Sequence, residues 1–137
     1  DHLEHGKVLG FFVSQDGSTY YEYYTSFNPA VGEWYQLAIV WETDKVPKFY
    51  INGVQVPTIG PAPITSIFNN ADAPLHIGRS TYNTNRYLKG ALDEIRISSV
   101  GRLSDWLLTN FDNQKDPPAF YIIAEEEQLS VLPPFVS

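Results

Sequence analysis

The adjacent carboxylates Asp93 and Glu94 are the residues of this sequence whose types and spacing come closest to a catalytic pair. Hydrolysis of a glycosidic bond needs two carboxyl groups that flank this bond, about 5–5.5 Å apart in retaining enzymes, and a strand can present both only on one of its faces. In a strand, residues i and i+2 share a face, whereas immediate neighbours diverge. Position 91 is alanine and position 95 is isoleucine, so no acid pairs with Asp93 along a strand. The pattern therefore predicts that the chain is not an enzyme.

Asp93 is also a candidate metal ligand. In a predicted strand over 91–98 it shares a face with Ala91, Ile95 and Ile97, a pattern typical of a core face. A carboxylate on such a face is costly unless it is hydrogen-bonded or bound to a cation. Two interpretations stay open: Asp93 accepts hydrogen bonds from backbone amides, or it binds a structural calcium ion together with oxygens from other loops.

Tyrosine and tryptophan side chains offer a second kind of chemistry, because a flat ring can stack on the C–H face of a sugar. The stretch 19–27 alternates aromatic rings on two faces, of which one must be core. The loop 82–87 joins aromatics with an amide and a guanidinium, although loops also carry Asn and Tyr for turn reasons. The candidate ligand-binding residues are Tyr21, Tyr23, Trp41, Tyr82, Asn85, Arg86 and Tyr87. Cross-strand packing is the alternative for Tyr21 and Tyr23, and a core position is the alternative for Trp41.

Strand signals dominate the elements that would position these side chains. The Asn52-Gly53 pair predicts a hairpin with a type I′ turn, in which both central residues have positive φ. A single short helix is expected over 104–112, with Ser104 as N-cap and an apolar stripe that includes Trp106. The predicted strands cover 7–13, 19–27, 34–42, 48–56, 75–79, 91–98 and 120–126. The sequence predicts an all-β fold, an antiparallel β-sandwich with one short helix.

Composition and charge exclude several classes of function. The 137 residues carry a formal net charge of −7, which disfavours nucleic acid and anionic membrane surfaces as partners. No stretch approaches the roughly 20 apolar residues of a membrane span, so we expect no membrane insertion. The chain has no Cys, which removes disulfides, zinc–thiolate sites and thiol nucleophiles. Glycans and proteins remain as partners.

Two segments resemble the laminin-G-like domains of the concanavalin-A-like lectin/glucanase superfamily. GEWYQLAIVW with KFYINGVQV is similar to a Gly-x-Trp core strand followed by an Asn-Gly hairpin, and LHIGR with LKGALDEIRIS and the helix that follows is similar to the family's C-terminal half. The resemblance implies a jelly-roll sandwich with Trp34 in its core. It also implies frequent glycan or protein binding, and in some members a structural calcium.

The resemblance predicts a laminin-G-like domain over 1–127 and a proline-containing linker or tail over 128–137. We expect the family's first strands to be lacking before Lys7, which would expose a sheet edge and favour a homodimer or association with the rest of a parent chain. The expected function is a non-catalytic carbohydrate-binding or adhesion module of a larger secreted or cell-surface protein. The alternatives are a structural or protein-interaction spacer, or a fragment of a glycan-active enzyme.

Overall fold

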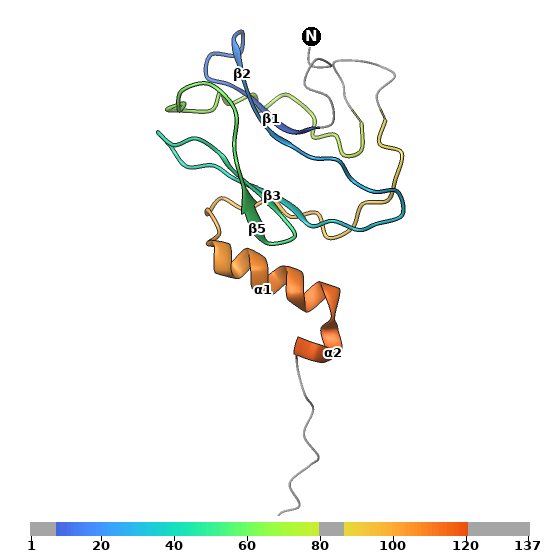
Figure 1. Ribbon diagram of the computed structural model, residues 1–137. Coiled ribbons are helices and arrows are strands. Elements are labelled where there is room, and N and C mark those ends of the chain that lie inside the picture. The colour runs from blue at the N-terminus through green and yellow to red at the C-terminus, as the bar shows by residue number, and fades with distance from the viewer. Residues whose placement is uncertain (1–7, 80–86, 121–137) are drawn as a thin grey trace, which may run out of the picture.

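The computed structural model describes residues 8–79 and 87–120, which form two antiparallel sheets with a helix beside them (Figure 1). One sheet has the order β1-β2 and the other the order β3-β4-β5. The elements are β1 (Val8–Ser14), β2 (Tyr20–Ser26), β3 (Leu37–Val40), β4 (Lys48–Ile51), β5 (Val54–Val56), α1 (Ser104–Lys115) and α2 (Pro117–Phe120). No helix among the described residues is long and apolar enough to cross a membrane.

The hydrophobic core lies between the two sheets. Its buried members come from β1, β2, β4 and the loop after β5: Val13, Tyr23, Phe49 and Ile64. Partly buried side chains from both sheets pack around them: Leu9, Phe11, Tyr21, Trp41 and Val56. Because strands of both sheets contribute inward-facing residues to one cluster, the predicted all-β antiparallel sandwich is confirmed.

The Asn52-Gly53 turn joins β4 to β5 and also seats the helix. Both residues have positive φ, 53° and 76°, as the sequence predicts. A Cβ on Gly53 would lie 2.7 Å from the Cα of Leu108, so only glycine lets α1 approach this closely. Leu107 is buried, and the Gln36 amide donates a hydrogen bond to Asn110 Oδ1 at 3.1 Å. The helix therefore covers the β4–β5 hairpin.

Details of the predicted helix differ from the structure. The helix begins at Ser104, but Leu103 takes the N-cap position and no side chain caps the helix. Trp106 is 40% exposed and lies under the Arg102 guanidinium, 4.8 Å from the ring centre, rather than anchoring the helix in the core. Trp34 is 66% exposed, so its expected core position is also wrong. Leu107 provides the buried contact in place of these rings.

Two of the predicted strands do not form. Residues 75–79 contribute only an isolated bridge between Arg79 and Tyr87, and residues 91–98 pair with no described strand. Apolar alternation favours a strand only where a neighbouring strand accepts its hydrogen bonds. In residues 91–98 the apolar side chains stay exposed, Ile97 at 80%. The predicted strand 120–126 and the linker 128–137 lie almost wholly outside the described residues.

Candidate functional site

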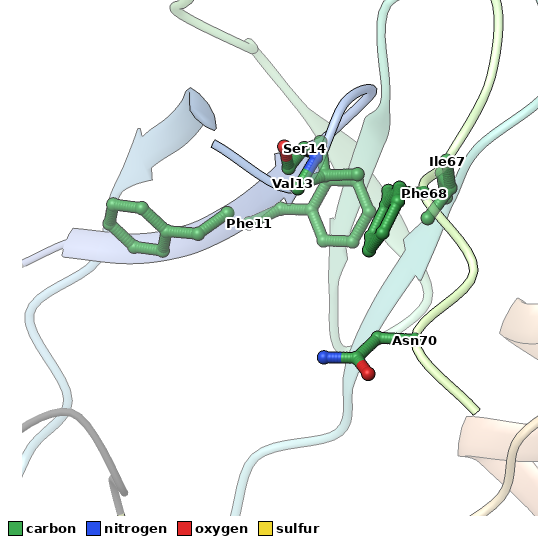
Figure 2. Close-up of a pocket in the computed structure, with 8 residues that line it drawn as sticks. Phe11, Val13, Ser14, Ile67, Phe68 and Asn70 are labelled. Carbon is green, nitrogen blue, oxygen red and sulfur yellow. Dashed lines mark hydrogen bonds between the residues drawn. The ribbon is translucent and has the colours of Figure 1, made fainter. Parts of the chain in front are cut away.

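An open hollow of about 370 Å³ lies between the end of β1 and the loop that contains Phe68 (Figure 2). Its volume falls within the range of about 300–1,000 Å³ that is usual for small-molecule sites. Figure 2 shows Ile67 and Phe68 beside β1, with the Asn70 amide projecting into the open space below them. The lining residues are Phe11, Phe12, Val13, Ser14, Gly17, Ile67, Phe68 and Asn70.

Strand alternation in β1 places Phe12 on the outer face of its sheet. Phe11 and Val13 face the core, so the intervening Phe12 must point away from it. The Phe12 side chain stands opposite Glu22 in the β1–β2 register and is 48% exposed. A half-exposed phenylalanine on a short two-stranded sheet offers an apolar ring face to a ligand.

The loop carrying Phe68 is held against β1 by three hydrogen bonds. Phe68 N donates to the Ser14 carbonyl at 2.8 Å. Gln15 Oε1 accepts from Thr65 N at 3.0 Å and from the Thr65 hydroxyl at 2.9 Å. These bonds fix the loop backbone at both ends of residues 65–68. The Phe68 ring, 46% exposed, therefore has a defined place next to β1.

The β1–β2 turn forms another wall of the hollow, and Asp16 organises it. The Asp16 carboxylate accepts hydrogen bonds from Ser18 N at 2.8 Å and Thr19 N at 2.7 Å. Because these amides stabilise the charged form, the pKa of Asp16 falls from 3.8 to about 2. Gly17 N donates to the Ser14 hydroxyl at 2.9 Å. The turn is therefore tied together by the side chains of Ser14 and Asp16.

The hollow offers aromatic rings and hydrogen-bonding groups to a ligand. Its described lining combines apolar and aromatic side chains with a serine hydroxyl and an amide. The nearby Asp16 stays ionised at neutral pH because its pKa is about 2, so it holds no proton to donate. Rings that stack and an amide that both donates and accepts can hold the apolar face and the hydroxyls of a sugar.

Comparison with known proteins places this sandwich in a family. The model of the concanavalin A-like lectin/glucanases superfamily, in its laminin-G form, matches residues 2–105. The chain belongs to this superfamily. The match spans both sheets and the walls of the hollow. The suspected laminin-G-like and concanavalin-A-like resemblance is thereby confirmed.

A solved structure shares this fold. It is the crystal structure of an S-layer domain-containing protein from Clostridium thermocellum, with a TM-score of 0.50 and 19% sequence identity. The match covers 77% of this chain, and this chain spans 63% of that structure. No curated protein sequence matches the chain.

Three of the predicted ligand-binding residues belong to the core of this superfamily sandwich. Tyr23 is fully buried, and its hydroxyl donates to the Ala62 carbonyl at 2.8 Å. Tyr21 and Trp41 are half-buried and pack against the same core cluster. The expectation that Tyr23 belongs to an exposed aromatic platform is therefore wrong, because the alternation of β2 turns this set of rings inward.

The other predicted ligand-binding residues come from the 82–87 loop. Tyr87 is 63% exposed and forms the isolated bridge with Arg79. Tyr82, Asn85 and Arg86 lie outside the described residues. The binding role of this loop stays a prediction.

Asp93 is exposed rather than placed on a core face, because residues 91–98 do not form the predicted strand. Its Oδ1 accepts a hydrogen bond from Glu94 N at 2.8 Å, and Glu94 has a φ of 52°. Within 8–79 and 87–120, no three His, Asp or Glu side chains gather as a metal site would require. The calcium-binding role of Asp93 stays a prediction.

Sequence reasoning missed the hollow, although one signal was present. Two adjacent phenylalanines in a strand must point to opposite faces, so one of Phe11 and Phe12 leaves the core whenever the other enters it. The second wall could not be located in the same way. Phe68 comes from a loop about fifty residues later, and tertiary contacts bring it to β1: the hydrogen bonds from Thr65 to Gln15 and from Phe68 N to the Ser14 carbonyl.

Proposed function

We propose that this chain is a non-catalytic carbohydrate-binding or adhesion module of a larger secreted or cell-surface protein, and that the hollow beside Phe12 and Phe68 is its ligand site. The observation that carries the proposal is the pair of rings, 48% and 46% exposed, next to the Asn70 amide. Stacking on the rings would hold a sugar, and the amide would orient its hydroxyls.

The expected location also has support from similarity. The structure with the same fold is named an S-layer domain-containing protein, which favours an extracellular or cell-surface setting. The net charge of −7 is compatible with neutral glycans and unfavourable for phosphate backbones. At 19% identity the shared fold leaves the ligand to be argued from the site, because one fold hosts many functions.

The absence of catalysis is part of the proposal. The lining of the hollow brings no carboxylate pair together, and Asp93 and Glu94 are sequence neighbours on an exposed segment. A glycoside hydrolase needs an acid and a second carboxylate on opposite sides of one bond. We expect no turnover of β-glucans, xylans, alginate or sialosides.

A protein-interaction spacer is the competing function. The observation in its favour is that Tyr21, Tyr23 and Trp41 serve the core and leave fewer exposed rings for sugars than the sequence predicts. A spacer would use the exposed apolar surface for packing against neighbouring domains and would bind no glycan.

A glycan array separates the two functions. The wild-type chain should bind a defined set of glycans with dissociation constants of about 1 μM to 1 mM, since a shallow site buries few ligand atoms. Phe68→Ala should lose that binding, and Tyr87→Ala is the matched control from the other candidate site. An empty array would favour the spacer. Binding lost in Tyr87→Ala and kept in Phe68→Ala would move the site to the 82–87 loop.

A further inference from the structure

The outer face of the β1–β2 sheet carries aromatic rings although it lies away from the core. Side chains alternate between the two faces of a strand. The inward set packs in the core: Phe11, Val13, Tyr21 and Tyr23. The outward set is therefore Gly10, Phe12 and Ser14 in β1 and Tyr20, Glu22 and Tyr24 in β2. Packing of the core does not account for the outward rings.

Two of the outward rings keep much of their surface exposed. Tyr20 is 60% exposed and Phe12 is 48% exposed. An aromatic side chain can bury about 150–250 Å², so each of these residues offers roughly 100 Å² to a ligand. In the register of the sheet, Phe12 stands opposite Glu22, and Tyr20 is the next outward residue beside Glu22. Diagonal neighbours of this kind lie about 7–8 Å apart, within reach of a single ligand.

Gly10 sets the place of the Phe12 ring on this face. A Cβ on Gly10 would lie 2.9 Å from Cε2 of the ring. Gly10 does not have a positive φ, so the ring makes use of the missing side chain rather than of backbone freedom. The Phe12 ring therefore leans along β1 into the space above Gly10, which keeps it low on the sheet. A ring in a defined place on a sheet is a surface on which a sugar can stack.

The hollow beside Phe12 and Phe68 continues onto this outer face. Phe12 and Ser14 both line the hollow, and both belong to the outward set. Phe68 N donates to the Ser14 carbonyl at 2.8 Å on one side, and Tyr20 pairs with Ser14 on the other. The backbones at Phe68, Ser14 and Tyr20 therefore lie side by side in that order, and Figure 2 shows Phe68 beside β1. With neighbouring strands about 4.8 Å apart, this row spans roughly 10 Å.

A single sugar ring cannot cover all three exposed aromatic rings along this row. A pyranose ring has only two faces, so it stacks on at most two aromatic rings. Phe12 and Phe68 line the hollow and would hold the first sugar. Tyr20 lies across β1 from Phe68, where it would meet the next sugar of a chain.

We propose that Tyr20 and Glu22 form a second sugar subsite, the outer subsite, so that the ligand is a linear chain of neutral sugars rather than a single terminal sugar. The proposal rests on the proposed function, because it extends the sugar site of the hollow. The first sugar lies in the hollow between Phe12 and Phe68, and the chain continues across β1 onto the Tyr20 ring.

Glu22 gives the outer subsite its polar group. A carboxylate has several acceptor positions, so Glu22 can accept a hydrogen bond from a sugar hydroxyl alongside any protein donor. Hydrogen bonds to an ionised acceptor are stronger than those between neutral groups, which suits a chain rich in hydroxyls. The net charge of −7 disfavours chains of uronate sugars. The expected ligand class is therefore neutral and polyhydroxylated.

The test is an amide chemical-shift titration with neutral oligosaccharides of one to six sugars from the cello, xylo and chito series. This method also measures the weak binding of a monosaccharide. In a series that binds, affinity should rise at least about tenfold from one sugar to three and then level off, because only the longer chain reaches Tyr20. The Tyr20 amide should shift with the trisaccharide and stay unchanged with the monosaccharide.

Variants separate the two subsites. Tyr20→Ala should weaken trisaccharide binding about tenfold and leave monosaccharide binding unchanged, whereas Phe68→Ala should weaken both. Ile59→Ala is the matched control, because Ile59 is 49% exposed and bridges Tyr24 on the far side of β2 from the hollow. Circular dichroism shows whether each variant is folded. If Tyr20→Ala unfolds, Tyr20→Thr replaces it, since threonine keeps strand propensity without a ring.

Equal affinity for one sugar and for three overturns the outer subsite while the sugar-binding role of the hollow stands. Trisaccharide binding that is undiminished in the folded Tyr20 variant, or that falls equally in Ile59→Ala, overturns it in the same way. Binding restricted to uronate or branched glycans on the array also overturns it. If no glycan binds at all, the proposed function itself fails, and the outer subsite fails with it.

Discussion

The Phe68 ring lies directly against Gly17, so closely that a Cβ on Gly17 would come within 2.9 Å of Cε1 of the ring. Gly17 also has a φ of 80°, a conformation that costs an L-residue about 1–2 kcal/mol. The turn after β1 and the loop after β5 thus meet at a position where any larger residue would be strained and would have to displace the Phe68 ring. This contact fixes one aromatic wall of the proposed sugar site.

Gly17→Ala should therefore destabilise the fold by more than backbone strain alone. The matched control is Gly32→Ala, because Gly32 has a φ of 86° and no atom within 4 Å of a Cβ. Both variants suffer the strain, and Gly17→Ala should cost about 1–3 kcal/mol more because the Phe68 ring must move. Urea unfolding monitored by fluorescence measures the difference. Equal losses of stability in the two variants would mean that the Gly17–Phe68 contact contributes nothing.

Tyr23→Phe tests the buried hydroxyl in the core. Removing the 2.8 Å hydrogen bond to the Ala62 carbonyl should cost about 1 kcal/mol at neutral pH. Burial raises the pKa of Tyr23, so the neutral ring stabilises the fold at pH values below about 10, and this contribution is lost as the pH rises through the raised pKa. The variant should lose less stability above pH 10 than the wild type, whereas the exposed control Tyr87→Phe should follow the wild type. If the stability of Tyr23→Phe falls above pH 10 as steeply as that of the wild type, the stabilising role assigned to the buried Tyr23 hydroxyl is contradicted.

Acid titration tests the turn held by Asp16. Hydrogen bonds from Ser18 N and Thr19 N lower the pKa of Asp16 from 3.8 to about 2. The stabilisation is therefore present above pH 3.8 and is lost as the pH falls toward 2. Asp16→Asn keeps an acceptor oxygen but no charge, so its stability should fall less steeply over this interval than that of the wild type. Asp72→Asn, on another exposed loop, is the control and should keep the wild-type slope.

The fold could be predicted from the sequence wherever a clear strand, turn or helix pattern needed only nearby residues as its hydrogen-bonding partners. The stretches 7–13 and 19–27 form β1 and β2, and the Asn52-Gly53 turn has the expected positive φ angles. The helix expected over 104–112 runs from Ser104 to Lys115. Residues 91–98 have an equally clear apolar alternation, but alternation does not supply the neighbouring strand that the hydrogen bonds need.

The candidate site could be predicted only in its chemistry, not in its place. Alternation shows that Tyr21 and Tyr23 share a face and that Tyr20 and Tyr24 share the other, but not which face is core. Packing against Phe49 of the opposite sheet settles the question and buries Tyr23. The same alternation applies to β1, the strand that pairs with β2. Its residues Phe11 and Val13 face the core, so Phe12 between them is exposed.

The measurement that tests the account most directly is an amide chemical-shift titration of the isotopically labelled chain with a glycan selected on the array. The account predicts that the shifted amides cluster at Phe12, Gly17, Phe68 and Asn70 around the hollow. Amides near Tyr23 in the core and Tyr87 on the other loop should stay unchanged. Shifts that cluster at Tyr87 instead, or saturating addition of the glycan without any shift at Phe68, would contradict the proposed site.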